Sequence, residues 1–155
     1  FCLEIMIVYH GTNMIVEHPV VRVCGYNKDF GFGFYCTRLE RQAQRWAISK
    51  HNTHIVCLYY YTPDDTLKVK IFENMTDEWL DFVAACRHGE PHGYDIVEGP
   101  MADDEVWDYV EDFLNGRISR EAFWVLAKFK HPTHQIIFCT DKALKTITFQ
   151  SYYTL

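Results

Sequence analysis

The chain has 155 residues, a length that suits one domain and leaves little room for two. Its residues are 48% hydrophobic, 16% aromatic and 23% charged, which provides a buried core and excludes a disordered or fibrous chain. The formal net charge is −6 with neutral histidines. That charge excludes an extended basic face for duplex phosphates, although a local basic groove remains compatible with it.

The cysteines favour a reducing compartment. There are six, at positions 2, 24, 36, 57, 86 and 139, without any CxxC pair and mostly within apolar or aromatic runs. Buried free thiols explain this pattern better than disulfides do. No stretch approaches the ~20 apolar residues of a membrane span, and no charged segment precedes an apolar one as in a signal peptide. We therefore expect a cytoplasmic protein with no membrane contact. The chain begins at Phe1 rather than Met, which leaves open that residues are missing upstream.

Apolar periodicity and turn residues predict the elements in chain order. In the first half we expect a strand over 5–9, a loop or edge strand over 14–23, a glycine-rich loop leading to an extended piece at 34–36, and a helix over 39–49. In the second half we expect strands over 55–61 and 67–72, a helix over 76–87, a strand over 94–97, helices over 103–114 and 119–129, a strand over 135–139, a helical turn over 141–144 and a strand over 146–150. Because strands and helices intermix without a βαβ period, these elements predict an α+β fold with a mixed or antiparallel sheet.

Three separated stretches, 9–12, 33–37 and 134–138, carry the candidate chemistry. Their order, together with the step of eleven residues from Tyr35 to Trp46, resembles the diphtheria-toxin-like and poly-ADP-ribose-polymerase-like branch of the ADP-ribosyltransferases. In that branch the NAD site is built by a His on the first strand, a Tyr in a GFY-S/T stretch, a second aromatic residue and a polar residue of a third motif.

The chain is still more similar to a bacterial family known as domain of unknown function 3990. Residues 28–37 read Lys-Asp-Phe-Gly-x-Gly-Phe-Tyr-x-Thr, and residues 94–104 read Tyr-Asp-Ile-Val-x-Gly-Pro-x-Ala-Asp-Asp, as that family does. Gln135 stands in a Gln-x-x-Phe-x-Thr context that is also similar. The resemblance implies a single domain over 1–155 with two packed, mostly antiparallel sheets, a helical insertion and NAD in the cleft between the sheets.

The resemblance also implies roles for individual residues. Tyr35 offers an aromatic face to the cationic nicotinamide, an attraction of ~0.5–2 kcal/mol, and Trp46 forms the opposing wall. His10 bonds a ribose hydroxyl, the backbone of Gly11 pairs with the carboxamide, and Thr12 assists. The implied catalytic residues are His10, Tyr35, Gln135 and Asp104. The implied NAD-binding residues are His10, Gly11, Thr12, Phe34, Tyr35, Trp46 and Asp103.

The third motif departs from the family pattern. The best-known relatives have Glu where this chain has Gln135, and cleavage of NAD passes through an oxocarbenium-like state that a carboxylate stabilises. Two unit charges ~4 Å apart at an effective dielectric of ~20 interact by ~4 kcal/mol, which is roughly a thousandfold in rate. Either turnover is slow or another carboxylate contributes, with Asp103 and Asp104 the first candidates and Asp95 and Glu98 behind them.

The resemblance implies single transfer of ADP-ribose from NAD to a macromolecular acceptor, protein or nucleic acid. It further suggests a bacterial toxin or effector with a small antitoxin as partner. Two alternatives remain open: an NAD glycohydrolase, in which water is the acceptor, and a non-catalytic module that binds NAD, ADP-ribose or a partner. No metal is expected.

Each candidate also has a purely structural interpretation. Tyr35 and Trp46 fit core positions, and His10 fits a turn. Asp103 fits a helix N-cap, and Gln135 can bond a neighbouring loop amide. The functional interpretation therefore depends on these residues coming together.

Other patterns are weaker. The His-x-x-His pairs at 51–54 and 131–134 lie at loop–strand junctions without further ligands nearby, so we expect structural histidines. The glycines of 31–33 lack the third glycine of a dinucleotide fingerprint. Cys86 and His88 lie on a helix end that points them apart, which argues against a thiol–imidazole pair.

Overall fold

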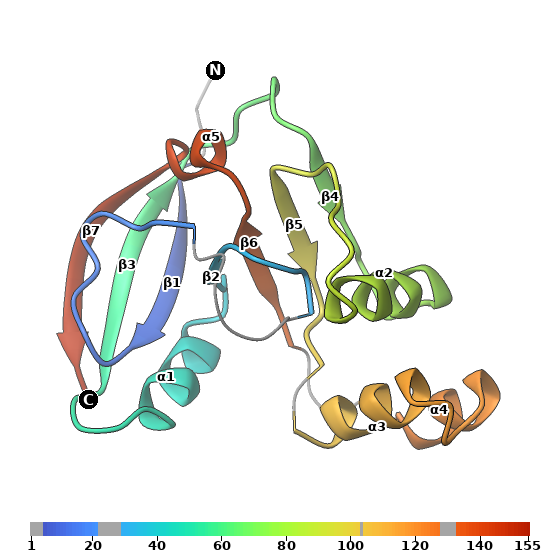
Figure 1. Ribbon diagram of the computed structural model, residues 1–155. Coiled ribbons are helices and arrows are strands. Elements are labelled where there is room, and N and C mark those ends of the chain that lie inside the picture. The colour runs from blue at the N-terminus through green and yellow to red at the C-terminus, as the bar shows by residue number, and fades with distance from the viewer. Residues whose placement is uncertain (1–4, 22–28, 103, 128–132) are drawn as a thin grey trace.

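The computed structural model describes residues 5–21, 29–102, 104–127 and 133–155, without the side chains of 104 and 105. Within these residues the chain forms seven strands in two sheets and five helices, so the expected α+β class is confirmed. The two sheets lie next to each other, with helices on their outer sides (Figure 1).

The first sheet has the order β1-β3-β7. It consists of β1 (Met6–Thr12), β3 (Ile55–Tyr61) and β7 (Ile147–Thr154), and both pairings are antiparallel. The register between β3 and β7 shifts at Leu58/Tyr59, which marks a β-bulge. The central strand β3 is rich in β-branched and aromatic residues, which favour a strand that is covered on both faces.

The second sheet has the order β2-β6-β5-β4. It consists of β2 (Phe34–Cys36), β6 (Gln135–Phe138), β5 (Ile96–Gly99) and β4 (Val69–Ile71). Only the β4–β5 pair is parallel, so the two sheets of the described residues are mostly antiparallel, as expected.

The sheets pack face to face over one hydrophobic cluster. Val8, Cys57 and Tyr59 of the first sheet meet Phe34 and Phe138 of the second. Besides this packing, a pair of backbone hydrogen bonds joins Tyr9 of β1 to Thr37, just after β2, at 2.8 and 2.9 Å.

Helix α1 (Glu40–Ile48) covers the outer face of the first sheet. Ala43 and Ala47 lie on one side of the helix, four residues apart, and pack on Val56 of β3. Small residues on both sides bring the helix close to β1, where Gly11 lies directly beneath it. The C-terminal half of α1, including Trp46, therefore lies directly against β1.

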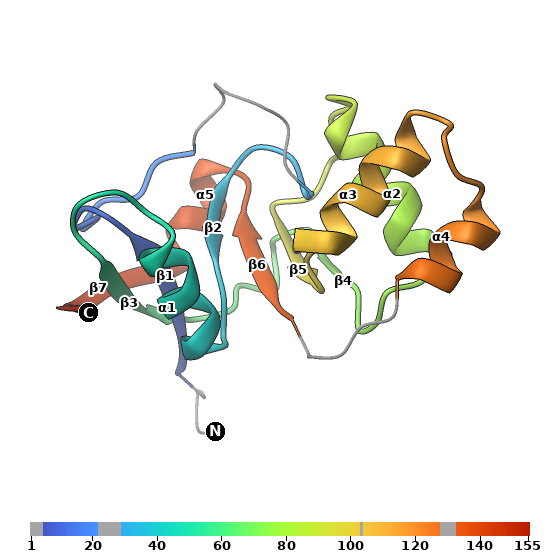
Figure 2. The same cartoon turned by 90° about the horizontal axis from the view of Figure 1, so that it is seen from below.

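Three further helices cover the outer face of the second sheet, at the opposite end from α1 (Figure 2). They are α2 (Asp77–Arg87), α3 (Asp104–Leu114) and α4 (Arg120–Leu126). Their apolar side chains join Val97 and Ile137 in a second hydrophobic cluster. A one-turn helix, α5 (Asp141–Leu144), connects β6 to β7.

Hydroxyl side chains cap α2 and α4. The Thr76 hydroxyl accepts from the Trp79 amide at 3.2 Å, and the Ser119 hydroxyl accepts from the Ala122 amide at 3.1 Å. Gly116 ends the α3 segment with a φ of 70°. The expected cap Asp103 lies outside the described residues.

Of the loop or edge strand expected over 14–23, residues 14–21 form a loop, while 22 and 23 lie outside the described residues. The Val16 carbonyl accepts from the Tyr59 hydroxyl at 2.5 Å, which holds this loop to the first sheet. Strand β7 continues to Thr154 instead of ending at 150, because its last residues pair with the start of β3.

Four cysteines, Cys36, Cys57, Cys86 and Cys139, are free thiols, and Cys2 and Cys24 lie outside the described residues. Burial raises the pKa of the Cys86 and Cys139 thiols to about 12, so both are protonated and unreactive at neutral pH. In the part of the chain that the structure describes, no helix has the length and apolar character needed to cross a membrane.

Candidate functional site

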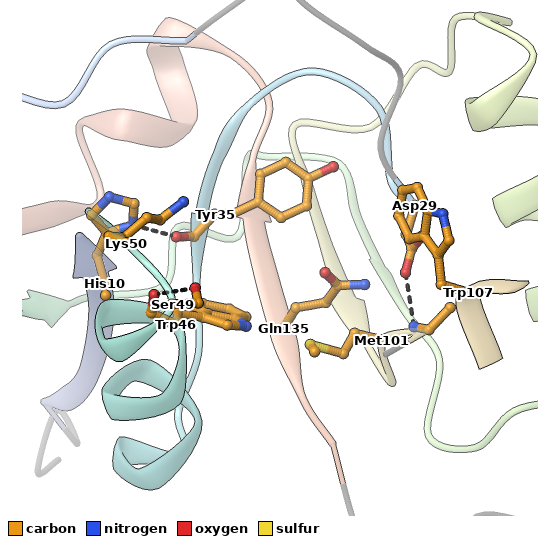
Figure 3. A pocket seen from close by; sticks show the side chains of 11 residues that line it. His10, Asp29, Tyr35, Trp46, Ser49, Lys50, Met101, Trp107 and Gln135 are labelled. Atoms are coloured by element: carbon orange, nitrogen blue, oxygen red, sulfur yellow. Dashed lines mark hydrogen bonds between the residues drawn. The ribbon is translucent and has the colours of Figure 1, made fainter. Parts of the chain in front are cut away.

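One cavity of about 500 Å³ gathers residues from distant parts of the chain (Figure 3). Its volume is typical of sites that hold small organic ligands. The lining residues come from β1, β2, α1, β6, α3 and the loops next to them: His10, Gly11, Asp29, Tyr35, Trp46, Ser49, Lys50, Met101, Ala102, Trp107 and Gln135. The structure thus brings five of the predicted site residues, at positions 10, 11, 35, 46 and 135, to one cavity.

The contacts that hold His10 include a hydrogen bond and a ring contact. Its Nδ1 donates to the Tyr35 carbonyl at 2.7 Å, and its ring packs on Phe34 with the centroids 4.3 Å apart. Because the carbonyl can only accept, Nδ1 carries a proton, and in the neutral form of the ring Nε2 is the acceptor. An acceptor nitrogen suits a ligand hydroxyl, as the sequence predicted for this residue.

Tyr35 is held by its hydroxyl. This group donates to the Gly31 carbonyl at 2.5 Å and accepts from the Phe30 amide at 3.3 Å. Burial, reinforced by the nearby charge of Asp29, raises the pKa of Tyr35 well above its usual value. The phenol therefore stays protonated and does not serve as an acid or base near neutral pH. Tyr35 therefore contributes an aromatic ring to the cavity lining.

Helix α1 contributes the opposite wall through Trp46, Ser49 and Lys50. A Cβ at Gly11 would meet Ala47 N and Trp46 Cβ, each at 2.8 Å, so glycine is required for this close approach. Lys50 is exposed at the rim, and its ammonium makes no ion pair or hydrogen bond with any residue that the structure describes. The helix thus supplies an aromatic wall and a cation.

Gln135, at the start of β6, lies next to Tyr35 in the middle of the cavity, with Trp46 on one side and Met101 on the other (Figure 3). Its side chain is only 3% exposed, and its Nε2 approaches the Pro100 carbonyl at 3.5 Å. Tyr35 and Gln135 belong to adjacent strands, in the register that pairs Cys36 with Ile136. Strand pairing therefore places the amide beside the phenol.

Asp29 and Trp107 form the far wall with Met101 (Figure 3). The Asp29 carboxylate binds the buried Arg87 guanidinium at 2.6 and 3.0 Å and accepts from the Ala102 amide at 2.8 Å. The carboxylate is therefore neutralised by an ion pair. Sequence analysis missed this aspartate, although it lies inside the 28–37 stretch that carried the family resemblance.

Other predicted site residues lie elsewhere. Thr12 ends β1, where its hydroxyl accepts from the Met14 amide at 3.3 Å, and it does not line the cavity. Phe34 points to the opposite face of β2 from Tyr35 and is buried between the sheets, where it supports His10. Asp103 lies outside the described residues, and Asp104 begins α3 with a side chain that is likewise outside them.

Asp95 and Glu98, the other two carboxylates considered from the sequence, bind residues outside the cavity. Glu98 binds Arg38 and His134, each with a closest approach of 2.9 Å. Asp95 accepts from the Lys68 amide at 3.0 Å and from the Thr140 hydroxyl at 2.7 Å. Neither lines the cavity, so neither replaces the carboxylate that Gln135 lacks.

Trp107 and Lys50 were also missed by sequence analysis. Trp107 falls on the apolar stripe of α3, which predicts core, and a lysine after a helix predicts only a favourable interaction with the helix dipole. No local pattern separates these two from ordinary residues, because the cavity forms only when α1 and α3 are positioned by the sheets.

The lining chemistry defines a class of site. Aromatic rings, one amide, one unpaired ammonium and one neutralised carboxylate suit a planar, anionic small molecule. Among the described residues, no three His, Cys, Asp or Glu side chains gather to hold a metal ion. The protein thus has an α+β fold with a cavity on the helix-covered side of the sheets, where Tyr35 and Gln135 of the second sheet lie between α1 and α3, and the chemistry of its lining suits an organic ligand.

Comparison with known sequences identifies the family. A model of the DUF3990 family, described as proteins of unknown function, matches residues 6–149. The chain belongs to this family, which confirms that part of the sequence resemblance. No curated protein matches the chain.

Proposed function

We propose that this protein is an NAD-dependent mono-ADP-ribosyltransferase that modifies a macromolecular acceptor, with an ADP-ribosyltransferase-like fold. One observation carries the proposal: four residues predicted from three separate stretches and one spacing line a single cavity, namely His10, Tyr35, Trp46 and Gln135. Tyr35 and Trp46 suit the flat cationic nicotinamide ring. Lys50 adds a charge that complements the diphosphate.

The chain's residues would act mainly by positioning. His10 Nε2 accepts from a ribose hydroxyl, while Tyr35 and Trp46 hold the nicotinamide ring. When the glycosidic bond from ribose C1′ to the nicotinamide nitrogen breaks, nicotinamide leaves with the bonding electron pair. The acceptor's nucleophile then bonds C1′ and gives up its proton. Gln135 would orient the ribose through its amide, without the charge of a carboxylate.

A second function is favoured by the charges in the cavity. Of the described lining residues, only Asp29 is acidic, and Arg87 neutralises it. A site without an unpaired carboxylate suits binding of NAD or ADP-ribose without chemistry. NAD hydrolysis remains a third possibility, because water can replace the acceptor.

The test compares Tyr35→Ala with Tyr35→Phe. Purified protein is incubated with NAD labelled in the adenylate, with and without cell lysate, and both nicotinamide release and labelled macromolecules are measured. We expect labelling by the parent and Tyr35→Phe, and none by Tyr35→Ala. Free ADP-ribose without lysate would indicate a hydrolase. Binding of NAD by calorimetry without release over hours would indicate the non-catalytic module.

A further inference from the structure

Trp107 lines the cavity from the side opposite to His10 and Trp46 (Figure 3). It belongs to α3 and to none of the stretches that suggested the NAD site. The cavity therefore has two aromatic walls from different helices, with Lys50 on the side of the first. A ligand with two planar groups joined by an anionic linker matches this arrangement.

Trp107 is held by an ion-pair network that contacts it directly. The Arg87 guanidinium carbon lies 3.6 Å from the centroid of the indole, which is a stacked cation–π contact. The same guanidinium binds Asp29 at 2.6 Å and Glu111 at 3.2 Å, and its side chain is 3% exposed. With α2, α3 and residue 29 joined through one guanidinium, the indole is fixed before any ligand arrives.

Stacking on Arg87 also determines which indole surface meets the ligand. Arg87 covers one face of Trp107, so the opposite face and the ring edges are what it presents to the cavity. Because Arg87 is itself paired with Asp29 and Glu111, it leaves no net positive charge behind the ring, and its effect is to fix the position of the indole. No described cation stacks on Trp46, so a fixed guanidinium behind the ring distinguishes Trp107 from Trp46.

We propose that Trp107, held by Arg87, is the stacking platform for the adenine ring of an adenine nucleotide. This rests on the proposed function in taking the ligand as NAD, whose adenine is neutral and whose nicotinamide is cationic. The cationic ring then lies with Tyr35 and Trp46, and the neutral ring lies on Trp107. Glycosidic bond cleavage does not involve this platform, which serves only to bind.

The experiment uses half-ligands and calorimetry. AMP and ADP-ribose carry the adenine, and nicotinamide mononucleotide carries the other ring. For Trp107→Leu we expect AMP and ADP-ribose to bind about 5- to 100-fold more weakly, the range that base–aromatic stacking supports. Nicotinamide mononucleotide should bind within about twofold of the parent. Trp124→Leu removes an indole from α4 outside the cavity and should leave all three affinities unchanged.

A measurement on the unaltered protein covers the case in which Trp107→Leu does not fold. With AMP bound, nuclear Overhauser effects should connect the adenine H2 and H8 protons to the indole protons of Trp107. Their absence, unchanged affinities in Trp107→Leu, or no AMP binding at millimolar concentration would each overturn the platform.

The results that would contradict the adenine platform differ from those that would contradict the proposed transferase activity. AMP bound on Trp107 without NAD cleavage supports the platform and removes the transferase. NAD cleavage with Trp107→Leu affinities unchanged supports the transferase and removes the platform.

Discussion

The Nδ1 of His10 donates to the Tyr35 carbonyl at 2.7 Å, across the boundary between the two sheets. One residue before His10 on β1, Tyr9 forms the backbone pair with Thr37 that joins the sheets. The imidazole is therefore positioned by the same junction that holds the sheets together. Orientation of the site and docking of the sheets depend on one small set of contacts.

Gly11→Ala should destabilise the protein and displace Trp46. The added Cβ would lie 2.8 Å from both Ala47 N and Trp46 Cβ, so α1 must move away from β1. Overpacking of this kind costs about 1–3 kcal/mol of unfolding free energy, measured by urea denaturation. Gly93→Ala is the matched control, because no atom lies within 4 Å of its Cβ position. Equal stability of the two variants would contradict the tight helix contact.

Asp29→Asn should be one of the most destabilising changes at the cavity. It removes the charge that faces the Arg87 guanidinium, and the two side chains are only 6% and 3% exposed. Breaking one side of a buried pair costs about 3–5 kcal/mol. Asp112→Asn breaks an exposed pair with Arg117 and should cost less than about 1 kcal/mol. Thermal and urea unfolding of both variants provide the comparison.

Glu98 should make stability depend on pH in the acid range. Although burial raises its pKa, the hydrogen bond from His134 and the charge of Arg38 lower it more, to below the usual 4.5. A lowered folded-state pKa gives stability that is present above 4.5 and is lost as the pH falls through the folded value. Glu98→Gln should therefore unfold with a flatter pH dependence below about 4.5 than the parent. Glu73→Gln, an exposed control, should follow the parent curve.

Gln135→Glu should increase NAD cleavage if the missing charge limits the rate. A carboxylate at this nearly buried position can contribute up to ~4 kcal/mol of charge stabilisation, or roughly a thousandfold in rate. Nicotinamide release by the two proteins gives the answer directly. Gln150→Glu makes the same chemical change at an exposed position of β7 and should have no effect. An unchanged rate in Gln135→Glu would place the chemistry elsewhere or exclude it.

Local sequence patterns predicted where helices and strands form better than they predicted which strands pair. Strand 55–61 was predicted with the bounds that the structure has, because its residues strongly favour strands. The last four residues of β7 were missed, since their strand conformation depends on pairing with residues 55–58 across the chain. The parallel pairing of β4 with β5 likewise has no local signal, because it depends on α2 crossing between them.

Among the residues that line the cavity, those within recognisable sequence stretches were predicted from the sequence. Those that reach the cavity only through helix packing were not predicted. Tyr35 and Gln135 were identified, and strand register brings them together. Phe34 was included with Tyr35, yet strand alternation turns neighbours to opposite faces, so it supports His10 from the core. Trp107 was not predicted as a site residue, because its position in the cavity wall depends on where α3 packs against the rest of the fold.

The order of the strands has a consequence for biosynthesis. β1 ends at residue 12, whereas β7, which completes the same sheet, begins at residue 147. Gln135 also comes late in the chain. A nascent polypeptide emerging from the ribosome therefore cannot assemble the cavity until almost all of these residues have been translated, and a chain that terminates early lacks both Gln135 and the strand that completes the first sheet.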